Sequence, residues 1–229
     1  MKNYALFLWI ALLMLGISGT IGAREVASFN DGWEFKKGPF SKEALQAVQK
    51  WNSDWQEGSI PHTWNADDMQ KQASAFYEGV GYYRKKFTFP ENMEGKRIFL
   101  RFEGVGSYAE VYINGYLIKD HYGSNAGFQV DITNYLVEGE NDLVVYCFDP
   151  SKDRSIPRGK QDWELEGHAI WYTRTTGIYK SVWLEQVDKK YIKNFFVRTK
   201  LDRYCISYDV EVSEPNGTLE IIVYDGNDS

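Results

Sequence analysis

Apolar and polar residues alternate along most of the chain with a period of two, which is the pattern of half-buried β-strands. The clearest case is residues 107–113, read SYAEVYI, and Asn114-Gly115 follows directly. This dipeptide predicts a two-residue hairpin, because both central residues of a type I′ turn have φ > 0. The predicted strands are residues 32–37, 82–89, 97–103, 107–113, 116–120, 128–131, 142–148 and 178–186. Their short length and regular spacing favour an all-β sandwich.

The apolar faces of these strands predict the core. Its expected members are Trp33, Phe35, Tyr83, Phe99, Tyr112, Val144, Tyr146, Val182 and Leu184. Helical spacing occurs only in short stretches, at residues 43–50 behind a possible N-cap at Ser41 and at residues 133–136. Both interrupt the strands without changing the all-β interpretation.

The character of the chain changes after Glu185. Residues 186–190 are polar and predict a linker, and residues 191–199, 203–212 and 218–224 predict three new strands. Three strands cannot enclose a core of their own. We therefore expect one domain over residues 24–186 and an incomplete second domain over residues 187–229.

The first 23 residues have the organisation of a secretory signal. Lys2 precedes an apolar run over residues 4–17, and small residues follow up to Ala23. The run is shorter than the about 20 apolar residues that a transmembrane helix needs. We expect residues 1–23 to be a signal peptide and the protein to be exported, to the periplasm or outside the cell. An uncleaved N-terminal anchor is the alternative.

Composition and charge exclude several classes of function. The formal net charge is -6, and no basic patch dominates any region, so we expect no nucleic-acid partner. Three scattered His and two Cys have no metal-ligand spacing, and neither a metal nor another cofactor is expected. Cys147 and Cys205 lie in different predicted domains, so we expect small buried hydrophobes rather than a disulfide.

One irregular segment, residues 149–177, is longer than most connections, and such loops are usually functional or disordered. Trp163 and Trp171 argue against disorder, because they need burial or a ligand. Their rings can present flat faces to a sugar, and Arg158 and Arg174 can donate to hydroxyl or carboxylate groups. The alternatives are that Trp171 belongs to the core and that Arg174 forms an internal salt bridge.

The same loop carries Asp162 and Glu164, two residues apart. In an extended segment their side chains would face the same side. Nothing in the surrounding sequence separates their pKa values as acid/base catalysis requires. A solvated acidic loop is therefore the favoured interpretation, and His168 is expected to be exposed.

Seven phrases are spread over nearly the whole chain after residue 23. They are FNDGWEF at residues 29–35, IPHTWN at 60–65, GVGYYRKKF at 79–87, FEGVGSYAEVYING at 102–115, FQVDITNYL at 128–136, GENDLVVYCFDP at 139–150 and RTTGIYKSVWLE at 174–185. In their order and spacing they resemble the N-terminal sugar-binding domain of glycoside hydrolase family 2, the family of β-galactosidases, β-glucuronidases and β-mannosidases. The resemblance implies a galactose-binding-like jelly-roll sandwich, then an immunoglobulin-like domain, then a catalytic (β/α)₈ barrel. The chain is then expected to hold the first, to begin an incomplete immunoglobulin-like sandwich, and to end before the barrel.

The resemblance places the chemistry outside this chain. The family cleaves glycosidic bonds with retention, which needs two carboxyl groups about 5–5.5 Å apart. In the family both are barrel glutamates, and the acid/base follows an Asn. No Asn-Glu dipeptide occurs in the 229 residues. We therefore expect no catalytic residue in this chain and no hydrolysis by the chain alone.

The resemblance also implies the partners: a β-linked carbohydrate and the protein's own downstream barrel. In the family, loops of the first domain complete the sugar pocket, and an acidic residue upstream of the Arg174–Ile178 motif contacts sugar or a metal in some members. The candidate substrate-binding residues are Arg158, Asp162, Trp163, Glu164, Trp171 and Arg174. Two other hypotheses stay open: a free-standing carbohydrate-binding module, and an inactive fragment of an interrupted gene.

Overall fold

The computed structural model describes residues 24–38, 54–66, 76–89, 94–157, 159–164 and 166–223. The expected signal peptide at residues 1–23, the expected helix at 43–50 and Arg158 lie outside these ranges. Backbone contacts divide the chain into two units. One is Glu25–Gln186, and the other includes Val187 and the described residues that follow it.

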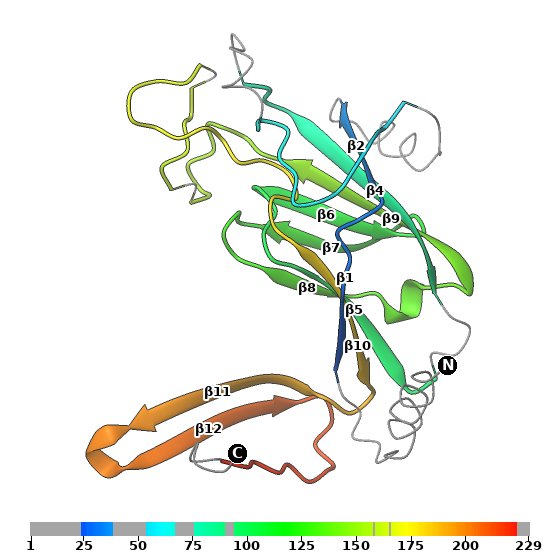
Figure 1. The fold of residues 1–229 in the computed structure, drawn as a ribbon, viewed down its shortest axis with the longest axis vertical. Helices are drawn as coiled ribbons and strands as arrows, with labels where there is room; N and C mark the ends of the chain where they lie inside the picture. Colours follow the sequence, from blue (N-terminus) through cyan, green and yellow to red (C-terminus); the bar gives the residue numbers. More distant parts are fainter. Residues whose placement is uncertain are drawn as a thin grey trace, which may run out of the picture. The chain divides into compact units, whose positions relative to one another are not determined.

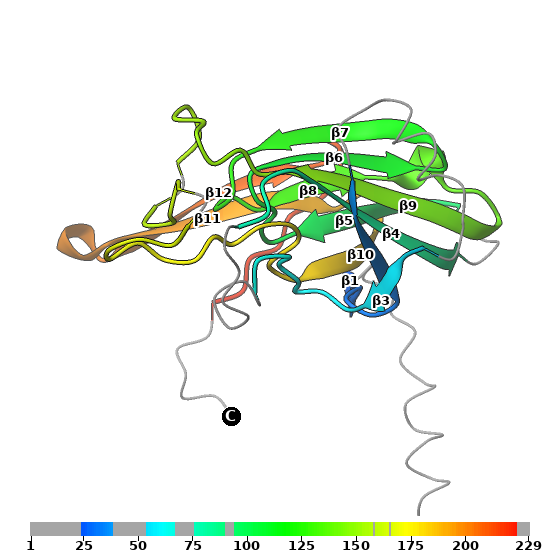
Figure 2. The same ribbon diagram turned by 90° about the horizontal axis from the view of Figure 1, so that it is seen from above.

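The first unit is built from antiparallel strands. They are β1 (Glu25–Ser28), β2 (Trp33–Gly38), β3 (Gln56–Gly58), β4 (Val80–Phe89), β5 (Lys96–Phe102), β6 (Tyr108–Ile113), β7 (Tyr116–Tyr122), β8 (Phe128–Asp131), β9 (Gly139–Phe148) and β10 (Val182–Asp188). A 3-10 helix, η1 (Thr133–Tyr135), lies where a short helical turn was predicted. The described strands form a six-stranded sheet in the order β3-β2-β4-β9-β6-β7 and a four-stranded sheet in the order β1-β10-β5-β8. In Figure 1 the strands β4, β9, β6 and β7 of the larger sheet lie above β8, β5 and β10 of the smaller sheet, and Figure 2 views the same strands from above.

The main core lies between the two sheets. Alternate residues of each strand point inward, such as Ile98, Leu100 and Phe102 of β5, all fully buried. The all-β sandwich predicted from the sequence is confirmed. Eight of the nine predicted core residues are buried, and Leu184 is partly buried against this cluster.

A second apolar cluster lies on the other face of the six-stranded sheet. Its buried members are Val80, Tyr82, Tyr112, Val144 and Tyr146. Beside it Arg84, only 1% exposed, pairs with Glu34 through Nε at 2.7 Å and lies 4.0 Å over the Trp55 ring. The central strands are therefore buried on both faces, which is why polar and apolar residues do not alternate strictly in β4 and β9.

The predicted hairpin turn is confirmed. Asn114 has φ 49° and Gly115 has φ 85°, and Ile113 of β6 faces Tyr116 of β7. The Asn114 side chain also donates to Asn141 Oδ1 at 2.8 Å. The dipeptide thus closes the hairpin and fixes its end to β9.

Two short edge strands were missed from the sequence. β1 pairs with β10 and β3 pairs with β2, and all seven of their residues are exposed. β3 reads Gln-Glu-Gly, so it carries no apolar signal. The strand predicted at 178–186 begins only at Val182, because residues 178–181 form no strand and the Tyr179 amide donates instead to the Gly177 carbonyl at 3.0 Å.

The second unit contains a hairpin of β11 (Ile192–Lys200) and β12 (Cys205–Val212), joined by a 3-10 helix, η2 (Leu201–Arg203). Its register pairs Phe195 with Val210 and Val197 with Tyr208, which places these apolar side chains on one face. The third strand predicted at 218–224 is wrong over residues 218–223, which form no strand. A strand needs a hydrogen-bonded neighbour, and alternation in the sequence does not supply one.

The two cysteines are unbridged, as predicted, but they differ in burial. Cys147 is buried in the core, whereas Cys205 is exposed on the hairpin. The expectation that both are buried hydrophobes is therefore wrong for Cys205. Among the described residues, no helix has the length and apolar character to cross a membrane.

Gly177 generates a stability prediction. Its φ is +74°, and an added Cβ would overlap the Tyr83 hydroxyl and lie 3.1 Å from the Trp64 ring. Gly177→Ala should lower the free energy of unfolding by at least about 2 kcal/mol, because left-handed strain and overpacking add. Urea denaturation measures this.

Gly32→Ala is the matched control for that substitution. Gly32 has φ +66° but nothing within 4 Å of an added Cβ, so it retains the strain without the crowding. Its cost should be about 1 kcal/mol. Equal costs for the two variants would show that the Tyr83 contact is unimportant.

Candidate functional site

The site begins where β6 and β9 pair side by side. Tyr108 lies opposite Phe148, so Ser107 before β6 comes next to Asp149 after β9. The Ser107 amide donates to the Phe148 carbonyl at 3.1 Å, and its hydroxyl donates to Asp149 Oδ1. Asp149 is 8% exposed, so its buried carboxylate needs partners.

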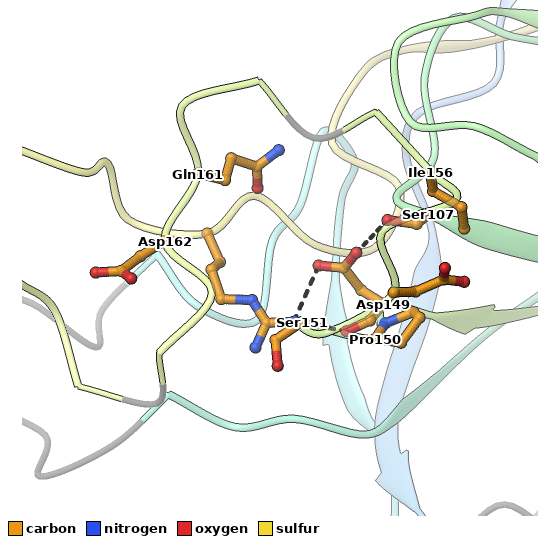
Figure 3. Close-up of a pocket in the computed structure, with 9 residues that line it drawn as sticks. Ser107, Asp149, Pro150, Ser151, Ile156, Gln161 and Asp162 are labelled. Atoms are coloured by element: carbon orange, nitrogen blue, oxygen red, sulfur yellow. Dashed lines mark hydrogen bonds and ion pairs between the residues drawn. The ribbon is translucent and has the colours of Figure 1, made fainter.

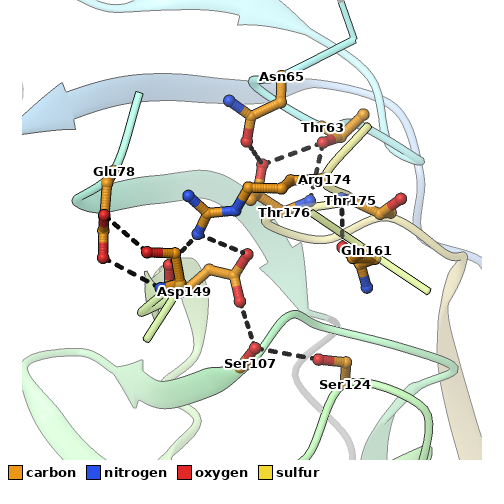
Figure 4. Close-up of polar contacts among 11 residues, drawn as sticks. Thr63, Asn65, Glu78, Ser107, Ser124, Asp149, Gln161, Arg174, Thr175 and Thr176 are labelled. Carbon is orange, nitrogen blue, oxygen red and sulfur yellow. Dashed lines mark hydrogen bonds and ion pairs between the residues drawn. The ribbon is translucent and has the colours of Figure 1, made fainter. Parts of the chain in front are cut away.

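Arg174 supplies the charge that Asp149 needs. Its Nη2 donates to the Asp149 carbonyl at 2.6 Å and lies 3.4 Å from Asp149 Oδ2 (Figure 4). Arg174 itself is 3% exposed. The internal salt bridge, one of the two interpretations of Arg174, is therefore present and pins the far end of the loop to the end of β9.

The residues after Arg174 fix the loop to a turn far away in sequence. The Thr176 amide donates to Thr63 Oγ1 at 2.9 Å, and the Thr176 hydroxyl donates to Asn65 Oδ1 at 2.8 Å. The Thr175 amide donates to Gln161 Oε1 at 2.6 Å. Residues 174–177 are thus held by polar contacts with Asp149 and Gln161 and with the turn that contains Thr63 and Asn65 (Figure 4).

The start of the loop has its own anchor. Glu78, just before β4, accepts from the Ser151 amide at 3.0 Å and the Ser151 hydroxyl at 2.8 Å. Sequence reasoning missed Glu78, Asn65 and Gln161. Glu78 and Asn65 meet partners 73 and 111 residues away, so no local pattern could have indicated them.

Asp162 organises the middle of the loop. It is 1% exposed and accepts from the amides of Glu164 at 3.0 Å and His168 at 2.8 Å. The His168 imidazole lies 2.8 Å from Asp162 Oδ1. Burial alone would raise the pKa of the Asp162 carboxyl, but the two amides and the imidazole outweigh burial and lower it below the ordinary value. Asp162 is therefore a charged internal brace.

Two predictions about this loop are wrong. The favoured interpretation, a solvated acidic loop, is wrong for Asp162, which is buried, and holds for Glu164, which is exposed; the alternative that the two carboxyl groups share a side is therefore also excluded. The reason is the bond from the Glu164 amide to Asp162 Oδ1, which closes a turn where an extended segment was assumed. His168 is also only partly exposed, because its ring is held against Asp162.

The two tryptophans of the loop pack on each other. Trp163 and Trp171 are partly buried, with ring centroids 4.5 Å apart at 68°. The Trp163 ring also meets the His168 ring edge-on at 5.2 Å. Beyond them Ile170 and Tyr172 are 71% and 63% exposed, so the loop presents an apolar tip to solvent.

A small cavity lies between the loop and the end of β9. Its polar lining includes Asp149, Ser151, Asp153, Gln161, Asp162 and Arg174 (Figure 3). The Nη1 atom of Arg174 is buried and has no hydrogen-bond partner among the described residues. Of the candidate substrate-binding residues, Arg174 and Asp162 line this cavity, whereas Trp163, Glu164 and Trp171 do not. No three His, Cys, Asp or Glu side chains of the described residues gather as a metal site.

Residues 26–188 match the family model of the sugar-binding domain of family 2 glycosyl hydrolases. The chain belongs to glycoside hydrolase family 2. The domain that carries this cavity is therefore the sugar-binding domain of the family, and the resemblance inferred from the sequence motifs is confirmed.

Family 2 relatives with two activities are similar to this chain. A beta-galactosidase of Thermoanaerobacter pseudethanolicus is 32% identical over 183 residues, covering 78% of this chain and 23% of the relative. A beta-glucuronidase of Bacteroides fragilis is 26% identical over 239 residues, covering 98% of this chain and 31% of the relative. The solved structure of a beta-glucuronidase from an uncultured Clostridium sp. superposes with a TM-score of 0.67 at 25% identity, covering 84% of this chain and 34% of that one. The chain thus spans between 23% and 34% of the length of these proteins.

The brace at Asp162 leads to a pH prediction. Because the pKa of Asp162 is lowered in the folded chain, its contribution to loop stability is present above the ordinary value of 3.8. It is lost as the pH falls through the lowered pKa. Hydrogen-exchange protection of the Glu164 and His168 amides, relative to core amides, should therefore decline below pH 3.8.

Asp162→Asn should reduce the protection of these two amides already at neutral pH, because the amide side chain accepts more weakly and carries no charge. Glu166→Gln is the control, since Glu166 is exposed on the same loop. Unchanged protection in Asp162→Asn would contradict the assigned role of the brace.

Proposed function

We propose that this chain is the non-catalytic, N-terminal sugar-binding portion of an exported family 2 glycosidase of the β-galactosidase type. Its contribution is a scaffold that docks on the protein's own catalytic barrel and a loop that forms the rim of the substrate pocket. Support comes from the match to the sugar-binding domain and from a relative named beta-galactosidase. The signal-like pattern of residues 1–23 supports export.

The observation that carries this proposal is the match of residues 26–188 to the sugar-binding domain of the family. In this domain the loop that leads to Arg174 is fixed by the Asp149–Arg174 pair and by the Thr63 and Asn65 contacts, so a pocket rim formed by the loop is held in place before a ligand arrives. The cavity beside Arg174 has a volume of about 10 Å³, room for about one water, so it belongs to the bracing of the loop and does not enclose a sugar.

The same geometry argues against chemistry by this loop. Retaining hydrolysis needs one carboxyl group with a raised pKa to donate a proton. The pKa of Asp162 is lowered, and Glu164 points away from it into solvent. The loop therefore supplies no acid/base pair, and bond cleavage is assigned to the barrel.

A free-standing carbohydrate-binding module is the second candidate. The specific observation in its favour is the pair of partly exposed rings, Trp163 and Trp171, next to the exposed Tyr172. Aromatic rings of this kind stack on sugar faces. The two candidates differ in whether this chain binds sugar unaided and with useful affinity.

The proposal predicts that the purified 229-residue chain does not hydrolyse a chromogenic β-galactoside. Calorimetric titration with galacto-oligosaccharides should show weak binding, because only the rim of the pocket is present. Turnover that co-purifies with the chain through successive columns would contradict the non-catalytic assignment.

Two variants separate the rim from the module. Trp163→Ala should leave weak sugar binding nearly unchanged if other residues of the loop form the pocket rim, and should abolish it if the rings form a module surface. Tyr116→Ala is the control for loss of an aromatic ring, since Tyr116 is 65% exposed and faces Ile113 at the opposite end of the β6–β7 hairpin from Ser107. Strong binding that is lost in Trp163→Ala alone would favour the module.

A further inference from the structure

His168 carries an imidazole that is fixed on one side and open on the other. Its Nδ1 atom lies 2.8 Å from Asp162 Oδ1 and 3.0 Å from Asp162 Oδ2. Asp162 is 1% exposed and keeps its charge at neutral pH, because its pKa is lowered. An ionised carboxylate can only accept hydrogen bonds, so Nδ1 of His168 carries the proton of this contact. The Asp162 side chain therefore fixes both the orientation of the ring and the position of its proton.

The other ring nitrogen, Nε2, is open to solvent. The described residues give it no hydrogen-bond partner, and it is not one of their buried unpaired atoms. The His168 side chain is 38% exposed, which agrees with this position. Because the proton is on Nδ1, Nε2 of the neutral imidazole has a free lone pair and accepts hydrogen bonds. The ring thus presents an oriented acceptor at the surface of the loop.

The surroundings of the imidazole are apolar. The Trp163 ring meets it edge-on at 5.2 Å, and the Trp171 amide donates to the His168 carbonyl at 3.3 Å. Ile170, between His168 and Trp171 in sequence, is 71% exposed. An acceptor beside apolar surface matches a sugar ring, which carries hydroxyl and C–H groups side by side. Because Nε2 lies at the surface, such a ring can approach it without entering a cavity.

The acidic side chains of the loop are less suited to this contact. Asp162 uses Oδ1 to accept from the Glu164 amide and Oδ2 to accept from the His168 amide, and it is buried. Glu164 is exposed, but no hydrogen bond with the described residues fixes its carboxylate. Binding through a mobile side chain costs entropy that an oriented group does not lose. His168 combines the accessibility of Glu164 with the fixed position of Asp162.

We propose that His168 is a sugar-contacting residue of the pocket rim, and that its Nε2 atom accepts a hydrogen bond from a hydroxyl group of the carbohydrate. Asp162 is the positioning residue, which acts through His168 and does not touch the sugar. This inference rests on the proposed sugar-binding function and names a residue that recognises the substrate at that site.

Two substitutions separate the two sides of the ring. His168→Asn places an amide donor near the position of Nδ1 and nothing at Nε2, so it keeps the contact with Asp162 and removes the contact with sugar. His168→Gln is longer and places its amide near the position of Nε2, so it does the reverse. Both variants lose the ring contact with Trp163, which makes each the control for the other.

The measurement is a titration of the isotope-labelled 229-residue chain with methyl β-D-galactopyranoside at pH 8, followed by nuclear magnetic resonance. The sugar should shift the signal of His168 Nε2. Affinity should fall by about threefold or more in His168→Asn, as expected for the loss of one hydrogen bond, and should fall less in His168→Gln.

Hydrogen exchange reports the structural side of the same pair. Protection of the Glu164 amide, which donates to Asp162, should be kept in His168→Asn and reduced in His168→Gln. Glu166→Gln removes an exposed charge from the same loop and should change neither the affinity nor the protection.

Wild-type affinity in His168→Asn, or equal losses of affinity in both histidine variants, would overturn the inference, because the ring would then serve only the fold of the loop. A sugar that shifts the Trp171 and Tyr172 amides but not Nε2 of His168 would do the same. Each of these results leaves the sugar-binding function standing. Absence of binding at about 0.1 M sugar, where a millimolar dissociation constant gives saturation, would overturn both.

Discussion

The antiparallel pairing of β6 with β9 is the constraint on which the site depends. It sets Ser107 beside Asp149 and leaves Asp149 only 8% exposed just after the end of β9. A buried charge without a partner is unfavourable, and Arg174 supplies the partner of Asp149. Their ion pair fixes the loop next to the end of β9. A slip of one residue in this register would turn every side chain of β6 to the other face. The position of Arg174, and with it the cavity, thus follows from strand pairing rather than from the loop's own sequence.

Most of the fold could be predicted from the sequence because its long strands alternate in the expected way. The Asn114-Gly115 turn was readable because few dipeptides tolerate two positive φ angles. Short edge strands were not readable, since β3 carries no apolar residue. At residues 218–223 a strand was predicted where none forms. Leu219 and Ile221 occupy alternate positions, as in a strand, but both are exposed and the segment does not join a sheet. Alternation in the sequence shows which face of a strand is apolar. Whether the strand forms depends on a neighbouring strand, which the local sequence does not reveal.

The candidate site was predicted less completely, for a related reason. Arg174 was identified because a guanidinium can donate to hydroxyl or carboxylate groups, and an internal salt bridge was one of its two interpretations. The geometry around Asp162 was not, since the turn from Asp162 to the Glu164 amide replaces the extended segment that spacing suggested. Glu78 and Asn65 could not be found at all, because they become part of the site only when distant segments meet. The sequence shows which side chains could bind or pair. Which residues they contact depends on how the fold brings distant segments together.

The contacts that build the cavity span long stretches of chain, from 25 residues for Asp149 with Arg174 to 111 for Asn65 with Thr176. Closing such loops costs entropy, so these contacts are favourable only in a chain whose sheets have paired. The cavity is therefore formed only when the sandwich is folded, and both are lost together on unfolding. By linkage, a ligand that binds only the folded loop would stabilise the sheets as well, and a core substitution distant from Arg174 would weaken that binding without removing a ligand contact.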